Sequence, residues 1–84
     1  MQITNVKINK VERKDRLRAF AEIVLDDEIC IRSIRIIEGK TRLFVAMPSV
    51  KDSERKYNDV VFPINHESRK KIEEAILKKY NIQE

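Results

Sequence analysis

One stretch with a clear period of two residues constrains the fold of this chain more than any other feature. Between residues 17 and 25, every second residue is apolar, and these residues share one face: Leu17, Ala19, Ala21, Ile23 and Leu25. A period of two residues is typical of a β-strand with one buried face. The acidic turn 26–28 follows, and the β-branched run 29–37 then predicts an antiparallel partner strand. The centre of the chain is therefore predicted to be a β-hairpin.

Weaker patterns on either side predict further extended segments. Residues 3–11 alternate weakly, residues 43–47 form an apolar run that Pro48 ends, and residues 60–64 make a short extended segment. We expect a charged turn at 12–15 and an exposed loop at 49–58. Gly39, the only glycine, predicts a tight turn in which it adopts a positive φ.

The C-terminal part predicts one helix. Pro63 disfavours a helical conformation for Phe62, and Asn65 is a good N-cap for a helix beginning at about residue 66. Four apolar residues then fall on one stripe at helical spacing: Ile72, Ala75, Ile76 and Tyr80. We expect Asn81 to end the helix in the left-handed conformation.

These elements predict a single α+β domain over residues 1–84. It comprises a small antiparallel sheet of four to five strands within 1–64, which includes the exposed loop 49–58, and one C-terminal helix at 65–81. One helix covers only one face of such a sheet. The other face is expected to expose Phe20, Val24, Ile34 and Ile36, so we predict a homodimer in which a second copy covers them.

Composition narrows the classes of function. The formal net charge is +4, from 18 Lys and Arg against 14 Asp and Glu, which fits either an anionic partner or an ordinary lysine-rich protein. Cys30 is expected to be a small buried side chain, and His66 has no catalytic or metal-binding partner motif. We therefore predict no enzyme activity, no cofactor, no metal and no small-molecule substrate. No signal peptide or apolar membrane span is apparent, which predicts a cytoplasmic protein.

A basic cluster near the helix start, Arg69-Lys70-Lys71, is the main candidate for binding. A helix N-terminus favours acids and anions, so three cations there repel one another unless an anionic partner such as nucleic acid is bound. The alternative is a solvated helix face in which nearby glutamates pair with them. Three loop cations could add to the surface: Lys51, Arg55 and Lys56. Tyr57 could stack on a base or pack against the loop, and four other cations are weaker candidates: Arg32, Arg35, Lys40 and Arg42.

Several separated motifs occur in an order that resembles a known family. They are Leu17-Arg18-Ala19-Phe20-Ala21, Leu25-Asp26-Asp27-Glu28, Ile34-Arg35-Ile36-Ile37-Glu38-Gly39, Leu43-Phe44-Val45-Ala46-Met47-Pro48-Ser49, Asp59, Pro63-Ile64-Asn65 and Ser68-Arg69-Lys70-Lys71-Ile72. Together they span residues 1 to about 80. The chain resembles the SpoVG family, small bacterial proteins named for a role in spore septation.

The resemblance implies a cytoplasmic homodimer that binds DNA and often RNA. It implies a role in asymmetric septum formation in sporulating relatives and in broad regulation of gene expression in the others. The implied nucleic-acid contacts are Arg69 and Lys71, with Lys51, Arg55 and Lys56 as loop candidates. Many members have His-Asp where this chain has Arg32-Ser33. A function that depends on those His and Asp side chains is therefore not expected in this chain.

Two other functions remain open at this point. The first is a protein-interaction module in septum formation that does not itself bind nucleic acid. The second is peripheral binding to a membrane, which is disfavoured because the apolar stripe of the helix is needed for the core.

Overall fold

The computed structural model describes residues 1–12 and 15–82 of the chain. Its elements are β1 (Ile3–Lys10), β2 (Leu17–Leu25), β3 (Ile29–Glu38), β4 (Leu43–Ala46), β5 (Ser49–Lys51), β6 (Tyr57–Asp59) and α1 (His66–Ile82). The first four strands form an antiparallel sheet in the order β1-β2-β3-β4, and β5 pairs with β6 in a separate two-stranded ribbon. The predicted α+β class, central hairpin and C-terminal helix are confirmed. The turn predicted at 12–15 falls partly outside the described residues.

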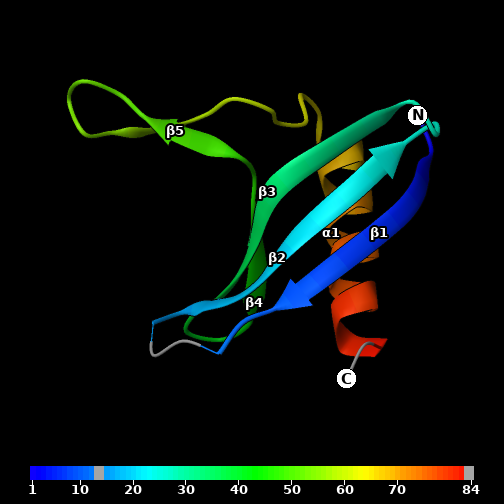
Figure 1. Ribbon diagram of the computed structural model, residues 1–84, viewed down its shortest axis with the longest axis horizontal. Coiled ribbons are helices and arrows are strands. Elements are labelled where there is room, and N and C mark those ends of the chain that lie inside the picture. The colour runs from blue at the N-terminus through cyan, green and yellow to red at the C-terminus, as the bar shows by residue number, and fades with distance from the viewer. Residues whose placement is uncertain (13–14, 83–84) are drawn as a thin grey trace.

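The core lies between the sheet and α1, which runs behind the strands (Figure 1). Four isoleucines are fully buried there: Ile23, Ile34, Ile36 and Ile76. Ile72 is also buried on the helix, as its place in the apolar stripe predicts, while Ala75 and Tyr80 are half-buried at the margins. The helix therefore contributes a narrow apolar stripe, and the sheet contributes most of the buried side chains.

A β-bulge in β3 decides which isoleucines face the helix. Leu25 pairs with Ile29 and Ile23 with Ile31, but Ala21 then pairs with Ile34, so one extra residue is inserted opposite β2. Ser33, within this insertion, has a φ of 64°. A bulge of this kind shifts the following residues to the opposite face of the strand.

The predicted exposure of Ile34 and Ile36 is therefore wrong. Both side chains lie in the core, and Phe20 has Arg35 as its cross-strand neighbour in place of an isoleucine. The open face of the sheet carries Phe20 and Val24, as expected, and also Phe44 of β4. It is thus less apolar than the sequence pattern indicates.

The two tight turns of the sheet are built in different ways. The acidic turn places Asp26 and Asp27 at φ values of 53° and 55°, and Glu28 N donates to Leu25 O at 2.9 Å. Aspartate tolerates this left-handed region better than most residues, and two such residues match a tight hairpin turn.

Gly39, by contrast, does not have a positive φ, so that prediction is wrong. A Cβ at this position would lie 2.8 Å from Arg42 O. Gly39 is needed for space, because the backbone of the β3–β4 turn passes close to it.

The helix begins where the sequence predicts and ends later. Asn65 caps it, since Ser68 N donates to Asn65 Oδ1 at 2.8 Å. The helix continues through Asn81 to Ile82, and Asn81 has no positive φ, so the predicted left-handed end is wrong. Within the described residues, α1 is neither long nor apolar enough to cross a membrane.

Candidate nucleic-acid interface

The basic cluster occupies the first turns of α1, and its three side chains lie in different surroundings. Arg69 is half-buried. Lys70 points outward, and its Nζ lies 4.0 Å from Glu74 Oε1. Lys71 Nζ donates to the Met1 carbonyl oxygen at 2.6 Å, which links the helix start to the N-terminus. Two of the three cations therefore already have partners within the chain.

An acidic turn lies at the same end of the molecule as this cluster. Gln2 N donates to Asp26 Oδ1 at 2.8 Å and Asp26 N donates to Gln2 O at 2.8 Å, so the N-terminal residues lie between Lys71 and the 26–28 turn. Three carboxylates follow one another in that turn. They reduce the positive potential at the helix start, an effect that the linear sequence does not reveal.

The segment expected to be a loop, 49–58, forms the β5–β6 ribbon, so that prediction is corrected. Its turn is organised by one carboxylate. Asp52 accepts hydrogen bonds at 2.9 Å from Glu54 N, Lys56 N and Asn58 Nδ2. The bonds from Lys56 and then Asn58 lower the pKa of Asp52, so the carboxylate is ionised at neutral pH. The sequence missed the ribbon because its order comes from this polar network and not from apolar alternation.

The ribbon holds its cations at its tip. Arg55 lies in the turn with a φ of 63°, and Lys56 Nζ is 3.6 Å from Glu54 Oε2. Lys51 Nζ lies 5.6 Å from the centre of the Tyr57 ring, which is 67% exposed. Tyr57 therefore does not pack against the body of the protein. From residue 49 to 59 the ribbon carries three basic and three acidic residues, so it is exposed but not strongly positive.

The two groups of candidate residues belong to separate surfaces of the chain. The ribbon projects away from the sheet and helix, whereas the helix start lies against the N-terminal end of the sheet (Figure 1). Arg35 Nη2 donates to Ser49 Oγ at 3.1 Å and anchors the base of the ribbon to β3. A single chain does not bring Lys51, Arg55 and Lys56 together with the helix cluster.

An apolar hollow beside the helix start was missed by sequence reasoning. It has a volume of about 340 Å³, and its lining includes Met1, Leu25, Met47, Phe62 and Ile72. The segment before the helix adds exposed apolar side chains, among which Ile64 is 88% exposed. The signal was available in the sequence, since residues 60–64 are nearly all apolar and precede the N-cap.

Two other side chains are candidates for chemistry, Cys30 and His66, and both are exposed. Cys30 is exposed, so its predicted burial is wrong: it pairs with Val24 on the open face near the start of β3. His66 is exposed at the first position of α1. In residues 1–12 and 15–82, no group of three or more His, Cys, Asp or Glu side chains could hold a metal ion.

Comparison with known proteins identifies the family of this chain. The model of the SpoVG family matches residues 1–82. The chain belongs to the SpoVG family. A SpoVG relative from an Exiguobacterium species is 49% identical over 81 residues, which cover 96% of this chain and 82% of the relative. Relatives from Agathobacter rectalis and Listeria monocytogenes are each 44% identical over 80 residues, covering 95% of this chain and 92% and 78% of their own lengths. The Exiguobacterium and Agathobacter relatives are named "Putative septation protein SpoVG", and the Listeria relative has the same name with the number 2.

Proposed function

We propose that this chain is a nucleic-acid-binding regulatory protein of the SpoVG type, with DNA as its main ligand and RNA as a second. The names of its relatives support a link to septation and hence to cell division and sporulation. Its action would be on gene expression in the cytoplasm, as a homodimer. Family membership and the basic net charge support this proposal together.

The projecting ribbon is the observation that carries the proposal. A two-stranded β-ribbon is one of the two protein elements that fit the major groove of B-DNA. Here β5 and β6 stand clear of the body, and every residue from Val50 to Asp59 is exposed. Arg55 and Lys56 at the tip are placed to contact phosphates, and Tyr57 offers an exposed ring for stacking on an unpaired base.

The helix start provides the second set of contacts. The backbone N–H groups at a helix N-terminus favour phosphate, and Arg69, Lys70 and Lys71 add charge beside them. Lys71 can exchange its bond with the Met1 carbonyl for a phosphate without breaking any packing, because its side chain is exposed.

A homodimer would combine the surfaces that one chain keeps apart. Two ribbons and two helix starts would then form one extended basic surface. The exposed apolar side chains of Val60, Phe62 and Ile64 supply a reason for association. Sedimentation equilibrium at micromolar concentration tests this part, with a mass of twice 10.0 kDa expected and a monomer as the contrary result.

Salt-dependent binding of charge variants tests the function. We compare the wild type, Arg69→Ala with Lys71→Ala, and Arg55→Ala with Lys56→Ala on a labelled duplex. The logarithm of the affinity falls linearly with the logarithm of the salt concentration, and each lost phosphate contact flattens that slope by about 1. We expect each double variant to flatten the slope by about 2. Arg32 Nε lies 3.5 Å from Glu22 Oε1, and this pairing removes it from the candidate contacts. Lys7→Gln with Arg32→Gln, two exposed cations on either side of Glu22, is therefore the matched control and should leave the slope nearly unchanged. Equal slopes for all four proteins would refute the site.

One observation favours the alternative of a protein-interaction module in septum formation. The apolar hollow beside the helix start could receive an apolar side chain of a partner protein. Absence of salt-dependent binding to DNA and RNA in the wild type would favour this alternative.

A further inference from the structure

A second basic surface lies at the opposite end of the sheet from the acidic turn. Lys10 pairs with Ala19 and Glu38 pairs with Leu43, so the β1–β2 connection and the β3–β4 turn lie at the same end. Glu38 N donates to Arg16 O at 2.8 Å, which places these two connections side by side. Figure 1 shows the end of β1 and the β3–β4 turn toward the bottom of the molecule, with the 26–28 turn at the top.

Three exposed cations meet at this end. Arg16 lies beside Glu38 on one side of β3. On the other side Arg42 directly precedes β4, and Lys40 lies in the turn between β3 and β4. Because neighbouring strands are about 4.8 Å apart, the backbones of Arg16 and Arg42 are separated by roughly 10 Å. Lys40 and Arg42 also line a shallow hollow of about 320 Å³. The three side chains can therefore reach several points along one extended ligand.

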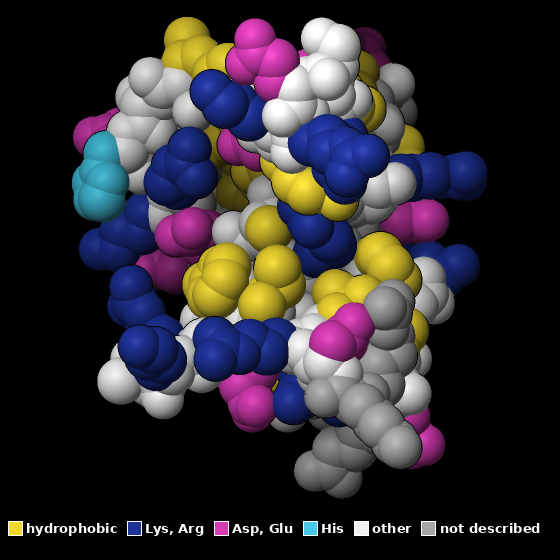
Figure 2. All heavy atoms as spheres, turned by 90° about the vertical axis from the view of Figure 1, so that its left-hand side faces the viewer, with side chains coloured by type: hydrophobic (Ala, Val, Ile, Leu, Met, Phe, Trp, Pro, Cys, Tyr) yellow, Lys and Arg dark blue, Asp and Glu magenta, His cyan; other side chains and the backbone are white. Residues whose placement is uncertain are grey.

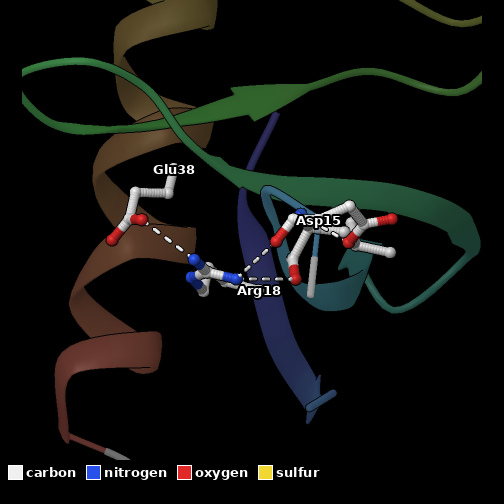
Figure 3. A network of polar contacts seen from close by, with 4 residues as sticks. Asp15, Arg18 and Glu38 are labelled. Atoms are coloured by element: carbon white, nitrogen blue, oxygen red, sulfur yellow. Dashed lines mark hydrogen bonds and ion pairs between the residues drawn. The ribbon is translucent and has the colours of Figure 1, made fainter. Parts of the chain in front are cut away.

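Two carboxylates beside these cations already have partners: Asp15 Oδ1 accepts from Leu17 N at 3.2 Å, and Glu38 is paired with Arg18. Arg18 Nη2 lies 2.9 Å from Glu38 Oε2, and Arg18 Nη1 donates to Asp15 O at 2.9 Å (Figure 3). Glu38 therefore does not neutralise Lys40 or Arg42. Among residues 1–12 and 15–82, no ion pair engages Arg16, Lys40 or Arg42.

Lys10, the last residue of β1, adds positive charge to the same end of the sheet. Its Nζ lies 4.7 Å from the centre of the Tyr80 ring, which places Tyr80 of α1 beside the end of β1. Lys79 lies elsewhere, in a hollow that Asn5 and Val6 also line, so it is not part of this surface. Figure 2, which keeps the vertical axis of Figure 1, shows a band of Lys and Arg side chains across the lower left of the molecule.

We propose that this basic end, defined as Arg16, Lys40 and Arg42, binds the phosphate backbone of a nucleic acid. The inference rests on the proposed function and adds a surface that the sequence did not group. At this end Lys10, Arg16, Arg18, Lys40 and Arg42 outnumber the carboxylates Glu12, Asp15 and Glu38. At the helix start, the three cations of the cluster lie beside the three carboxylates of the 26–28 turn. The basic end is therefore the stronger electrostatic site. The hollow is lined mainly by charged and polar residues, which suits a phosphate chain better than an apolar peptide.

The test compares two pairs of substitutions that remove the same charges. Lys40→Gln with Arg42→Gln removes one lysine and one arginine from the basic end, and Lys7→Gln with Arg32→Gln removes one of each from the middle of the sheet. All four residues are exposed, and the circular dichroism spectrum and unfolding midpoint of each variant check that the fold is kept. Affinity for a random-sequence 20-base-pair duplex is measured by fluorescence anisotropy at several salt concentrations.

We expect the basic-end variant to flatten the salt slope by about 2, with the mid-sheet variant close to the wild type. Adding Arg16→Gln should flatten the slope by about 1 more. If the wild type binds the duplex and the two variants have equal slopes, the inference is wrong while the proposed function stands. If the wild type binds neither duplex nor single strands, both fail. If the basic-end variant loses binding only to phosphatidylglycerol vesicles, the surface is a membrane contact and the inference is overturned.

Discussion

The sheet–helix body and the β5–β6 ribbon of this protein are held together by different forces. The body buries ten apolar side chains between four strands and α1. In the ribbon, Ser49 at its base is half-buried and the other residues are exposed, and its order comes from three cross-strand pairs and the bonds to Asp52. Burial of apolar surface stabilises the body cooperatively, whereas exposed hydrogen bonds contribute little net free energy each.

This difference means that the stability of the domain and the binding of ligands by the ribbon depend on different residues. Substitutions in the body should change the free energy of unfolding of the whole domain. Substitutions in the ribbon should change its local order and its contacts with ligands, with little effect on global stability. The candidate binding side chains of the ribbon can therefore be varied without loss of the fold.

The largest expected effect comes from the core. Ile76→Ala removes a fully buried side chain from the helix stripe and should lower the free energy of unfolding by about 2–5 kcal/mol. Val50→Ala, an apolar truncation in the ribbon, is the control and should change it by less than about 0.5 kcal/mol. Urea denaturation of both variants gives the comparison. Equal losses would show that the ribbon belongs to the cooperative core.

An intermediate effect is expected where the two regions join. Asn65→Ala removes the acceptor of Ser68 N at the helix start and should cost about 0.5–2 kcal/mol of global stability. Asn65→Asp keeps an acceptor at the same place and should retain most of the stability. The amide signals of the ribbon should be unchanged in both variants. An unfolding midpoint that does not move in Asn65→Ala would mean that the cap contributes nothing.

The smallest global effect is expected at Asp52. Asp52→Ala should increase hydrogen exchange at the amides of Glu54 and Lys56 while leaving the global unfolding midpoint unchanged. Asp59→Ala, which removes another carboxylate from the ribbon, is the control. A large loss of global stability in Asp52→Ala would contradict the separation of the two regions.

The same network predicts a pH effect of definite sign. Hydrogen bonds hold the pKa of Asp52 below its ordinary range. Its contribution to ribbon order should be fully present above the ordinary pKa of about 3.9 and should be lost as the pH falls through the lower, folded-state value. The amide chemical shifts of Glu54 and Lys56 between pH 6 and about pH 2 measure this. A transition centred above pH 4 would contradict it.

Local patterns in the sequence determined most of the body. Alternation at 17–25 gave the central strand, the paired aspartates gave a tight turn, and the Asn65 cap with Ile72 and Ile76 gave the start and the buried stripe of the helix. The family could also be recognised from motifs spread along the chain. These features depend on residues close together in sequence, so they can be read without knowing the fold.

The tertiary structure alone decided the features that depend on distant residues. The bulge at Ser33 moved Ile34 and Ile36 to the buried face, because pairing with β2 is set over the whole hairpin and not by alternation within β3. The fold also brings together charged residues that are far apart in the sequence. The N-terminus and the acidic turn lie beside the helix cluster, while Arg16 and Arg42 meet at the far end of the sheet. Electrostatic potential depends on distances in space, and those distances were absent from the sequence until the strands were paired.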